Sequence, residues 1–97
     1  MRESLHEPVS VVFYYNATRQ HVQPYMLTWQ NRDYRLGKVD FWHKTWKGKT
    51  LIHHFSLSDT EGTMYFKLAL DCDVLHWTIE EYMPASELRV HYGDWGA

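Results

Sequence analysis

The sequence predicts an all-β fold built from antiparallel strands. Apolar and polar residues alternate over most of the stretch from Val9 to Met83, and apolar residues are nowhere sustained at helical spacing. Turn-forming residues interrupt the alternation several times, as expected for strands joined by short hairpins. We therefore expect a curled antiparallel meander of five to six strands, or a small, partly open barrel. The length fits one domain over 1–97, with its core in 8–83 and a short tail in 84–97.

The first strand is expected from Val9 to Asn16. Pro8 stands at its start, where a missing backbone donor matters least. Residues 17–24 are mostly polar and are expected to form a connection. The sequence leaves open which edge of the sheet this first strand joins.

The next hairpin is expected to turn at residues 30–33. Such a turn sets Trp29 against Tyr34 and Leu27 against Leu36. All four side chains then lie on one face, because opposite residues of paired strands share a face.

A bulge at Gly37 and a turn at residues 46–48 shape the middle of the chain. The apolar parity changes between Leu36 and Val39, and a bulge at Gly37 would absorb the extra residue and bend the strand. A three-residue loop with Gly48 in the left-handed region then closes the hairpin. This register places on one face the residues Val39, Phe41, His43, Leu51, His53 and Phe55.

Two further turns, at residues 59–62 and 71–74, complete the meander. They set against each other Leu57 and Met64, Phe55 and Phe66, Leu70 and Leu75, Leu68 and Trp77, and Phe66 and Ile79. The predicted aromatic core row therefore consists of Phe41, Phe55, Phe66 and Trp77. In the tail, Pro84 could open one short helical turn.

Composition excludes several classes of protein. The chain is 44% hydrophobic and 16% aromatic, which argues against disorder, and its net charge of -2 argues against a wholly basic binder. Cys72 is the only cysteine, so an intrachain disulfide framework and a Cys-rich zinc ribbon are excluded. The sequence shows neither a membrane-spanning apolar run nor a signal peptide, and we expect a cytoplasmic protein without membrane partners.

The charge is unevenly distributed and points to one candidate binding surface. Residues 31–50 carry six Lys or Arg and two Asp, giving +4, so the rest of the chain carries -6. The predicted register places on the face opposite the core row Arg35, Lys38, Trp42, Lys44 and Trp46, joined by Ile52, His54, Tyr65 and His76, with Lys47 and Lys49 at the tip. Basic side chains follow a phosphate backbone and aromatic rings stack on unpaired bases. The hairpin at 32–49 is therefore expected to contact single-stranded nucleic acid or a protein.

Three alternatives remain open at this point. Trp42 and Trp46 could instead pack as a second hydrophobic layer, since Trp is usually well buried. His43 and His53, on one predicted face, could share a metal ion or small ligand, although no third ligand converges on them. The chain could also form a homodimer through an edge strand or through the Trp face.

No signal for catalysis is found in the sequence. A Gly-rich phosphate loop, a nucleophile elbow and a Ser/His/Asp spacing are all missing. The Asp residues that flank Cys72 would raise the pKa of its thiol, which disfavours a reactive thiolate. We therefore expect a non-enzymatic domain without a cofactor.

The order of motifs resembles an uncharacterised family of short, Trp-rich bacterial β domains. The resemblance rests on the segments 7–11, 24–36, 65–68 and 76–79 and on Trp42, and it covers residues 7–82. The family is a domain of unknown function, and it is weakly similar to the C-terminal segment of polymerase-like accessory proteins in mutagenesis. The resemblance implies a module that contacts protein or DNA in repair machinery, and it carries over no catalytic residues. The chain departs from the family pattern in Asn31, where Gly is common, and in its many His.

Overall fold

The described part of the chain, residues 3–84 of a computed structural model, is an antiparallel β-structure without helix. It contains seven strands, namely β1 (Glu3–Pro8), β2 (Ser10–Asn16), β3 (His21–Trp29), β4 (Arg32–Lys47), β5 (Thr50–Asp59), β6 (Met64–Asp71) and β7 (His76–Pro84). The prediction of an all-β, curled antiparallel fold is confirmed. The predicted count of five to six strands is wrong because β1 was missed: its residues are mostly polar, and it forms a strand only by pairing with β7.

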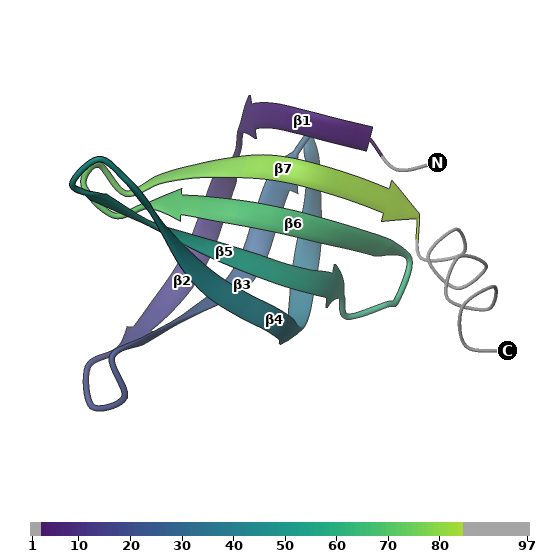
Figure 1. Cartoon of the computed structure of the whole chain (residues 1–97). Coiled ribbons are helices and arrows are strands. Elements are labelled where there is room, and N and C mark those ends of the chain that lie inside the picture. The colour runs from purple at the N-terminus through teal and green to yellow at the C-terminus, as the bar shows by residue number, and fades with distance from the viewer. Residues whose placement is uncertain (1–2, 85–97) are drawn as a thin grey trace, which may run out of the picture.

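The strands form one sheet in the order β1-β7-β6-β5-β4-β3-β2, curled into a half-barrel (Figure 1). The chain passes from β1 at one edge to β2 at the other edge through Val9, whose N–H donates to the carbonyl of Trp77 at 3.1 Å. The ring of Phe13 on β2 then packs on the Trp77 indole, with centroids 5.5 Å apart. The N-terminal segment therefore holds the two edges of the curled sheet together.

Strand β3 begins earlier than predicted, at His21, so the connection after β2 is limited to Ala17–Gln20. Pro24 lies buried inside β3, opposite Phe13 and beside a register shift. A bulge is one of the few places where a strand tolerates proline, because the ladder is already interrupted there.

Strand β4 bends sharply and belongs to both halves of the sheet (Figure 1). The bulge predicted at Gly37 is confirmed by a register shift between Leu36 and Val39, and a second shift follows between Val39 and Phe41. A Cβ at Gly37 would lie 3.3 Å from the backbone oxygen of Ser58, so glycine allows the two strands to approach closely at the bend.

The core lies on the concave face, which we call the inner face, and it matches most of the predicted row. Phe55, Phe66 and Trp77 are buried as predicted. They are joined there by Leu27, Trp29, Leu36, Leu57, Leu68, Leu70 and Ile79. Four of the five predicted pairs in the last two hairpins are shifted by two residues along the strand, as when Leu57 pairs with Phe66 and Leu70 with Trp77. The fifth is shifted by three, since Phe66 pairs with Tyr82 beyond a register shift. A shift of two keeps paired side chains on their predicted face. Leu75 is an exception, because it lies in the turn before β7 and is exposed.

The far part of the β4–β5 hairpin, residues 41–56, has a different register from the predicted one. We call this segment the distal hairpin. Lys47 pairs with Thr50, so the turn has two residues rather than three, with Gly48 at φ +63°. Together with the second bulge, this turn reverses the face of Phe41, which is 59% exposed on the outer face and does not belong to the core row.

The predicted tail lies mostly outside the described residues. Residues 85–97, which include the rest of the predicted tail and its helical turn, lie outside the described residues; Pro84 ends β7. Within residues 3–84, no helix has the length and apolar character needed to cross a membrane.

Candidate functional site

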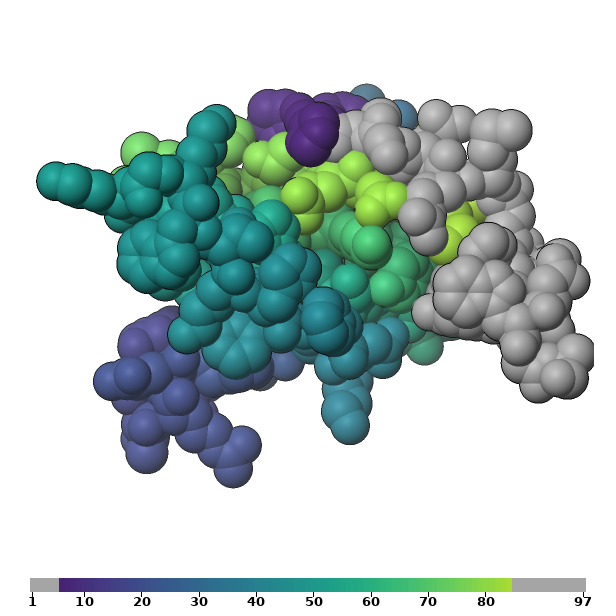
Figure 2. Space-filling model, viewed as in Figure 1, coloured from purple at the N-terminus to yellow at the C-terminus, as the bar shows by residue number. Residues whose placement is uncertain are grey.

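Three of the predicted site residues lie together on the inner face of the distal hairpin. Trp42 pairs with Phe55, Lys44 with His53 and Trp46 with Leu51. Because Phe55 belongs to the core, these pairs continue the inner face beyond the core towards the tip of the hairpin. In Figure 2 the teal residues of the hairpin project at one end of the molecule.

All of the predicted site residues were expected on the face opposite the core row, and this is wrong for Trp42, Lys44 and Trp46, which the two-residue turn and the second bulge place on the inner face. The other predicted site residues do not share this face. Arg35 and Lys38 precede the inner residues Leu36 and Val39 and point outwards, since neighbouring residues in a strand alternate. By the same alternation Lys47 lies on the outer face, and Lys49 lies in the turn. Of the predicted neighbours Ile52, His54, Tyr65 and His76, the first two pair with the outer residues Thr45 and His43.

Both tryptophans of the distal hairpin are accessible. Trp42 is 37% exposed and Trp46 is 68% exposed, whereas the core residue Trp77 is only 4% exposed. Trp46 therefore does not pack in a second hydrophobic layer, and Trp42 is only partly covered.

Trp42 and His53 together form one flat aromatic surface. The Trp42 Nε1–H donates to His53 Nδ1 at 2.9 Å, and the two ring planes are inclined by only 6°. Parallel rings stacked face to face lie roughly 3.5 Å apart, which is farther than these two nitrogen atoms. Since the indole N–H lies in its own ring plane, the rings must lie side by side, with centroids 5.7 Å apart. We call this pair the Trp42–His53 platform.

The side chains of Lys44 and His21 contact the Trp42 ring of the platform. The Lys44 Nζ lies 5.1 Å from the centroid of the Trp42 ring, within reach of a cation–π interaction. The His21 ring, from the start of β3, approaches Trp42 edge-on at 5.7 Å and 72°. A cation, a flat ring surface and an exposed second indole thus occur along one strand.

The charge state of His53 suits its part in the platform. Burial first, and then the nearby Lys44, His54 and His21, hold the pKa of His53 below its usual value. His53 is therefore neutral at neutral pH, and its Nδ1 can accept the hydrogen bond that the indole N–H donates.

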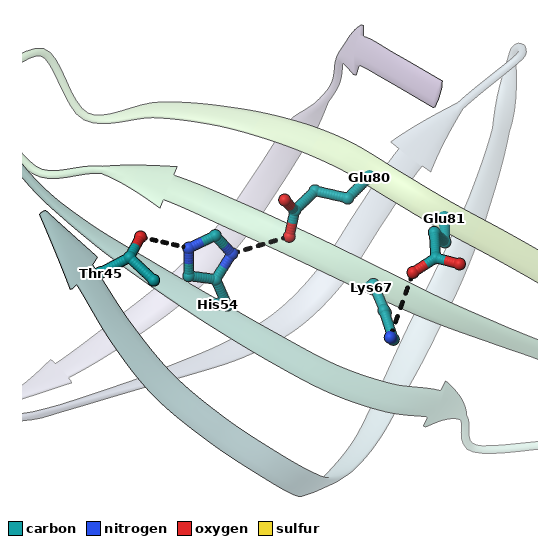
Figure 3. A network of polar contacts seen from close by, with 5 residues as sticks. All are labelled: Thr45, His54, Lys67, Glu80 and Glu81. Atoms are coloured by element: carbon teal, nitrogen blue, oxygen red, sulfur yellow. Dashed lines mark hydrogen bonds and ion pairs between the residues drawn. The ribbon is translucent and has the colours of Figure 1, made fainter. Parts of the chain in front are cut away.

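The outer face carries a separate polar network that joins three strands (Figure 3). His54 Nδ1 lies 2.8 Å from Glu80 Oε1, and its Nε2 lies 2.7 Å from the Thr45 hydroxyl. Because a carboxylate only accepts, Nδ1 carries the proton and Nε2 accepts from Thr45 when the ring is neutral. The His54–Glu80 contact crosses β6 at Ala69, the residue paired with His54, whose small side chain leaves room for it. His43 stacks face to face on His54, with centroids 4.5 Å apart and an angle of 7°.

These positions contradict the predicted His43/His53 site. His43 pairs with His54 and His53 pairs with Lys44, so the two histidines lie on opposite faces. Among residues 3–84, no group of three or more His, Cys, Asp or Glu side chains is arranged to hold a metal ion.

Sequence reasoning missed His53 and His21 as neighbours of Trp42. His53 was expected beside His43, because the second bulge in β4 has no glycine to mark it. His21 was expected in a polar connection and reaches Trp42 only because the sheet curls.

Comparisons of the chain with models of protein families, with curated proteins and with solved structures found no match. The resemblance to the Trp-rich β domains therefore stays a prediction.

Proposed function

We propose that this chain is a non-enzymatic interaction domain whose basic-aromatic hairpin, residues 32–49, binds single-stranded nucleic acid. The observation that carries the proposal is the Trp42–His53 platform, with the Lys44 ammonium over the Trp42 ring. Two coplanar rings offer a nucleobase a larger flat surface than one indole, and stacking of a base on an aromatic side chain contributes about 1–3 kcal/mol.

The spacing of groups along β4 supports an extended strand rather than a single base. Trp42, Lys44 and Trp46 alternate on the inner face, so the two indoles lie about 13 Å apart along the strand with a cation between them. One base could stack on the platform and another on Trp46, while Lys44 contacts the phosphate that lies between.

The charge distribution supports an anionic ligand. The segment 31–50 carries +4 in a chain with net charge -2. The outward-pointing Lys38 and Lys47 and the turn residue Lys49 are all exposed, and they add long-range attraction to phosphate without needing to touch it. A protein partner is the competing outcome, because exposed aromatic residues also mark protein interfaces.

Fluorescence titration with single-stranded oligonucleotides at two salt concentrations tests the proposal. We expect Trp quenching and an affinity that falls as salt rises, since binding releases counterions from the phosphates. A titration without quenching, or an affinity indifferent to salt, would show that the hairpin does not bind nucleic acid.

Two matched pairs of variants test the surface itself. Trp46→Ala should weaken binding roughly 5- to 140-fold. Phe41→Ala removes an exposed ring from the opposite face of the same hairpin and should have little effect. Lys44→Gln should weaken binding and reduce its salt dependence, whereas Lys67→Gln makes the same charge change at an ion pair on β6 and should leave binding nearly unchanged. Equal effects within either pair would contradict the assignment of the inner face.

A further inference from the structure

Strand β4 has a free edge along the distal hairpin. Strand β3 pairs with β4 only at residues 32–35, while β5 pairs with β4 as far as Lys47. Beyond the bend, no other strand of the described chain lies along the second edge of β4. Every residue from Asp40 to Lys49 is exposed. The edge from residue 41 to residue 47 is therefore open to pairing with another strand.

The backbone groups available at this edge follow from the two-residue turn. In such a hairpin the closing pair, Lys47 and Thr50, is hydrogen-bonded, and bonded and non-bonded pairs then alternate. Thr45 and His43 therefore bond to β5. The N–H and C=O groups of Trp42, Lys44 and Trp46 point away from β5, towards the free edge.

Exposed aromatic side chains lie on both faces of this edge. Trp42 and Trp46 lie on the inner face, and Phe41 and His43 lie on the outer face. A partner that covers one face would leave the other exposed. A strand that pairs with this edge places its own side chains beside the exposed rings on both faces.

We propose that the free edge of β4 pairs antiparallel with the same edge of a second copy of this chain, with Trp42 opposite Lys44 of the second copy. The side chains at this edge complement those of a second copy in the proposed register. Each Lys44 ammonium meets an indole of the other chain, a cation–π pair that the two-fold axis repeats, and His43 lies opposite His43 of the second copy.

The neighbouring registers are less favourable. A register with Lys44 opposite Lys44 sets like charges directly against each other. A register with Trp42 opposite Trp42 leaves only residues 41–43 to pair, because the second bulge lies between Val39 and Phe41. In the proposed register residues 41–45 pair across the axis, and Trp46, which would lie opposite Asp40, stays outside the ladder. Because the two copies use the same edge, the contact closes at two chains and does not propagate.

Disulfide trapping tests the register directly, in a Cys72→Ser background that removes the free thiol. In the proposed register His43 forms a non-hydrogen-bonded pair across the axis, with Cα atoms about 4.5 Å apart, which suits a disulfide. His43→Cys should therefore form a covalent dimer under mild oxidation. Thr45→Cys, on the same face of the same strand, is the matched control, because its two copies would lie roughly 13 Å or more apart. Equal cross-linking of the two variants would overturn the register.

Light scattering across a concentration series tests the dimer without a cysteine. The wild-type chain should approach twice its 11.7 kDa mass. Lys44→Pro removes an edge N–H that β5 does not use, and it should weaken dimerisation at least roughly tenfold while circular dichroism shows a folded sheet. Lys44→Gln removes the same charge but keeps the amide, so it should dimerise better than Lys44→Pro. A monomeric wild-type chain at all concentrations, or equal dimerisation of the two variants, would overturn the proposal.

The dimer does not rest on nucleic-acid binding, and the two proposals can fail separately. Cross-linking and light scattering are measured without oligonucleotide. The edge contact takes its backbone bonds and its cation–π pairs from Trp42 and Lys44, so Trp46 of each copy stays accessible in the dimer.

Discussion

The carboxylate of Asp59 should strongly stabilise the bend of β4, where the β4–β5 hairpin begins. Asp59 is only 6% exposed and lies opposite Leu36, at the bend of β4. It accepts from the N–H of Thr63 at 2.7 Å, from the N–H of Met64 at 3.1 Å and from the Thr63 hydroxyl. The adjacent Thr60 N–H donates to the Arg35 carbonyl at 2.7 Å, which ties this turn to β4.

Asp59→Ala leaves these donors without their acceptor. Hydrogen bonds to a charged group contribute about 1.5–3 kcal/mol each, but losses that share one group are not additive, so we expect a total loss of about 3–5 kcal/mol. Thr63→Val removes only the hydroxyl donor and should cost about 1–2 kcal/mol. Urea unfolding followed by Trp fluorescence measures both values. An Asp59→Ala variant within about 1 kcal/mol of the wild type would refute this reasoning.

The pH dependence gives an independent check. Burial alone would raise the pKa of Asp59, but the hydrogen bonds from Thr63, Met64 and Gly62 together hold it below its usual value. The stabilisation is therefore complete above the unfolded-state pKa of about 3.9 and is lost as the pH falls through the lower folded-state value. The difference in unfolding free energy between the wild type and Asp59→Asn should be constant near neutral pH and shrink only below about pH 4. A difference that shrinks well above that pH would assign the effect to another group.

Three further predictions follow from the bend, the platform and the outer network. Gly37→Ala should cost about 1 kcal/mol in urea unfolding, because its Cβ would crowd a backbone oxygen of β5 at 3.3 Å; an unchanged midpoint would contradict that crowding. Because the pKa of His53 is lowered, acidification should break the Trp42–His53 hydrogen bond only below the usual His range. The stabilisation from this bond is complete above about pH 6.5 and is lost as the pH falls through the folded-state pKa. Trp fluorescence should report the change, and His53→Leu should abolish it. Glu80→Ala should cost about 1 kcal/mol, because it leaves His54 Nδ1 without its acceptor, and a double-mutant cycle with His54→Ala should show coupling between the two residues.

The inner row of the sheet could be predicted from the sequence, but the register of the distal hairpin could not. Leu57 and Leu70 pair two residues away from their predicted partners, yet their faces are right, because burial fixes the face and tolerates a shift of two. Phe41 was assigned to the wrong face because the second bulge in β4 lacks a glycine and lies where the core ends. Beyond that point every β4 residue is exposed, so burial no longer distinguishes one register from another. Lys44, Trp42 and Trp46 were predicted to share a face, and they do, but it is the inner face and not the predicted opposite one. Their partners His53 and His21 depended on the register and on the curl of the sheet.

The distal hairpin is longer than the fold requires. The core reaches Phe55, whereas residues 41–49 are all exposed and bury little surface against it. Ordering each backbone residue costs about 1–2 kcal/mol, and here that cost is offset by contacts within the hairpin, such as the Trp42–His53 bond inside and the His43–His54 stack outside. Contacts that hold an exposed segment rigid reduce the entropy lost when a ligand binds to it. The inner rings then suit an anionic, base-bearing strand and the free backbone edge suits a second copy.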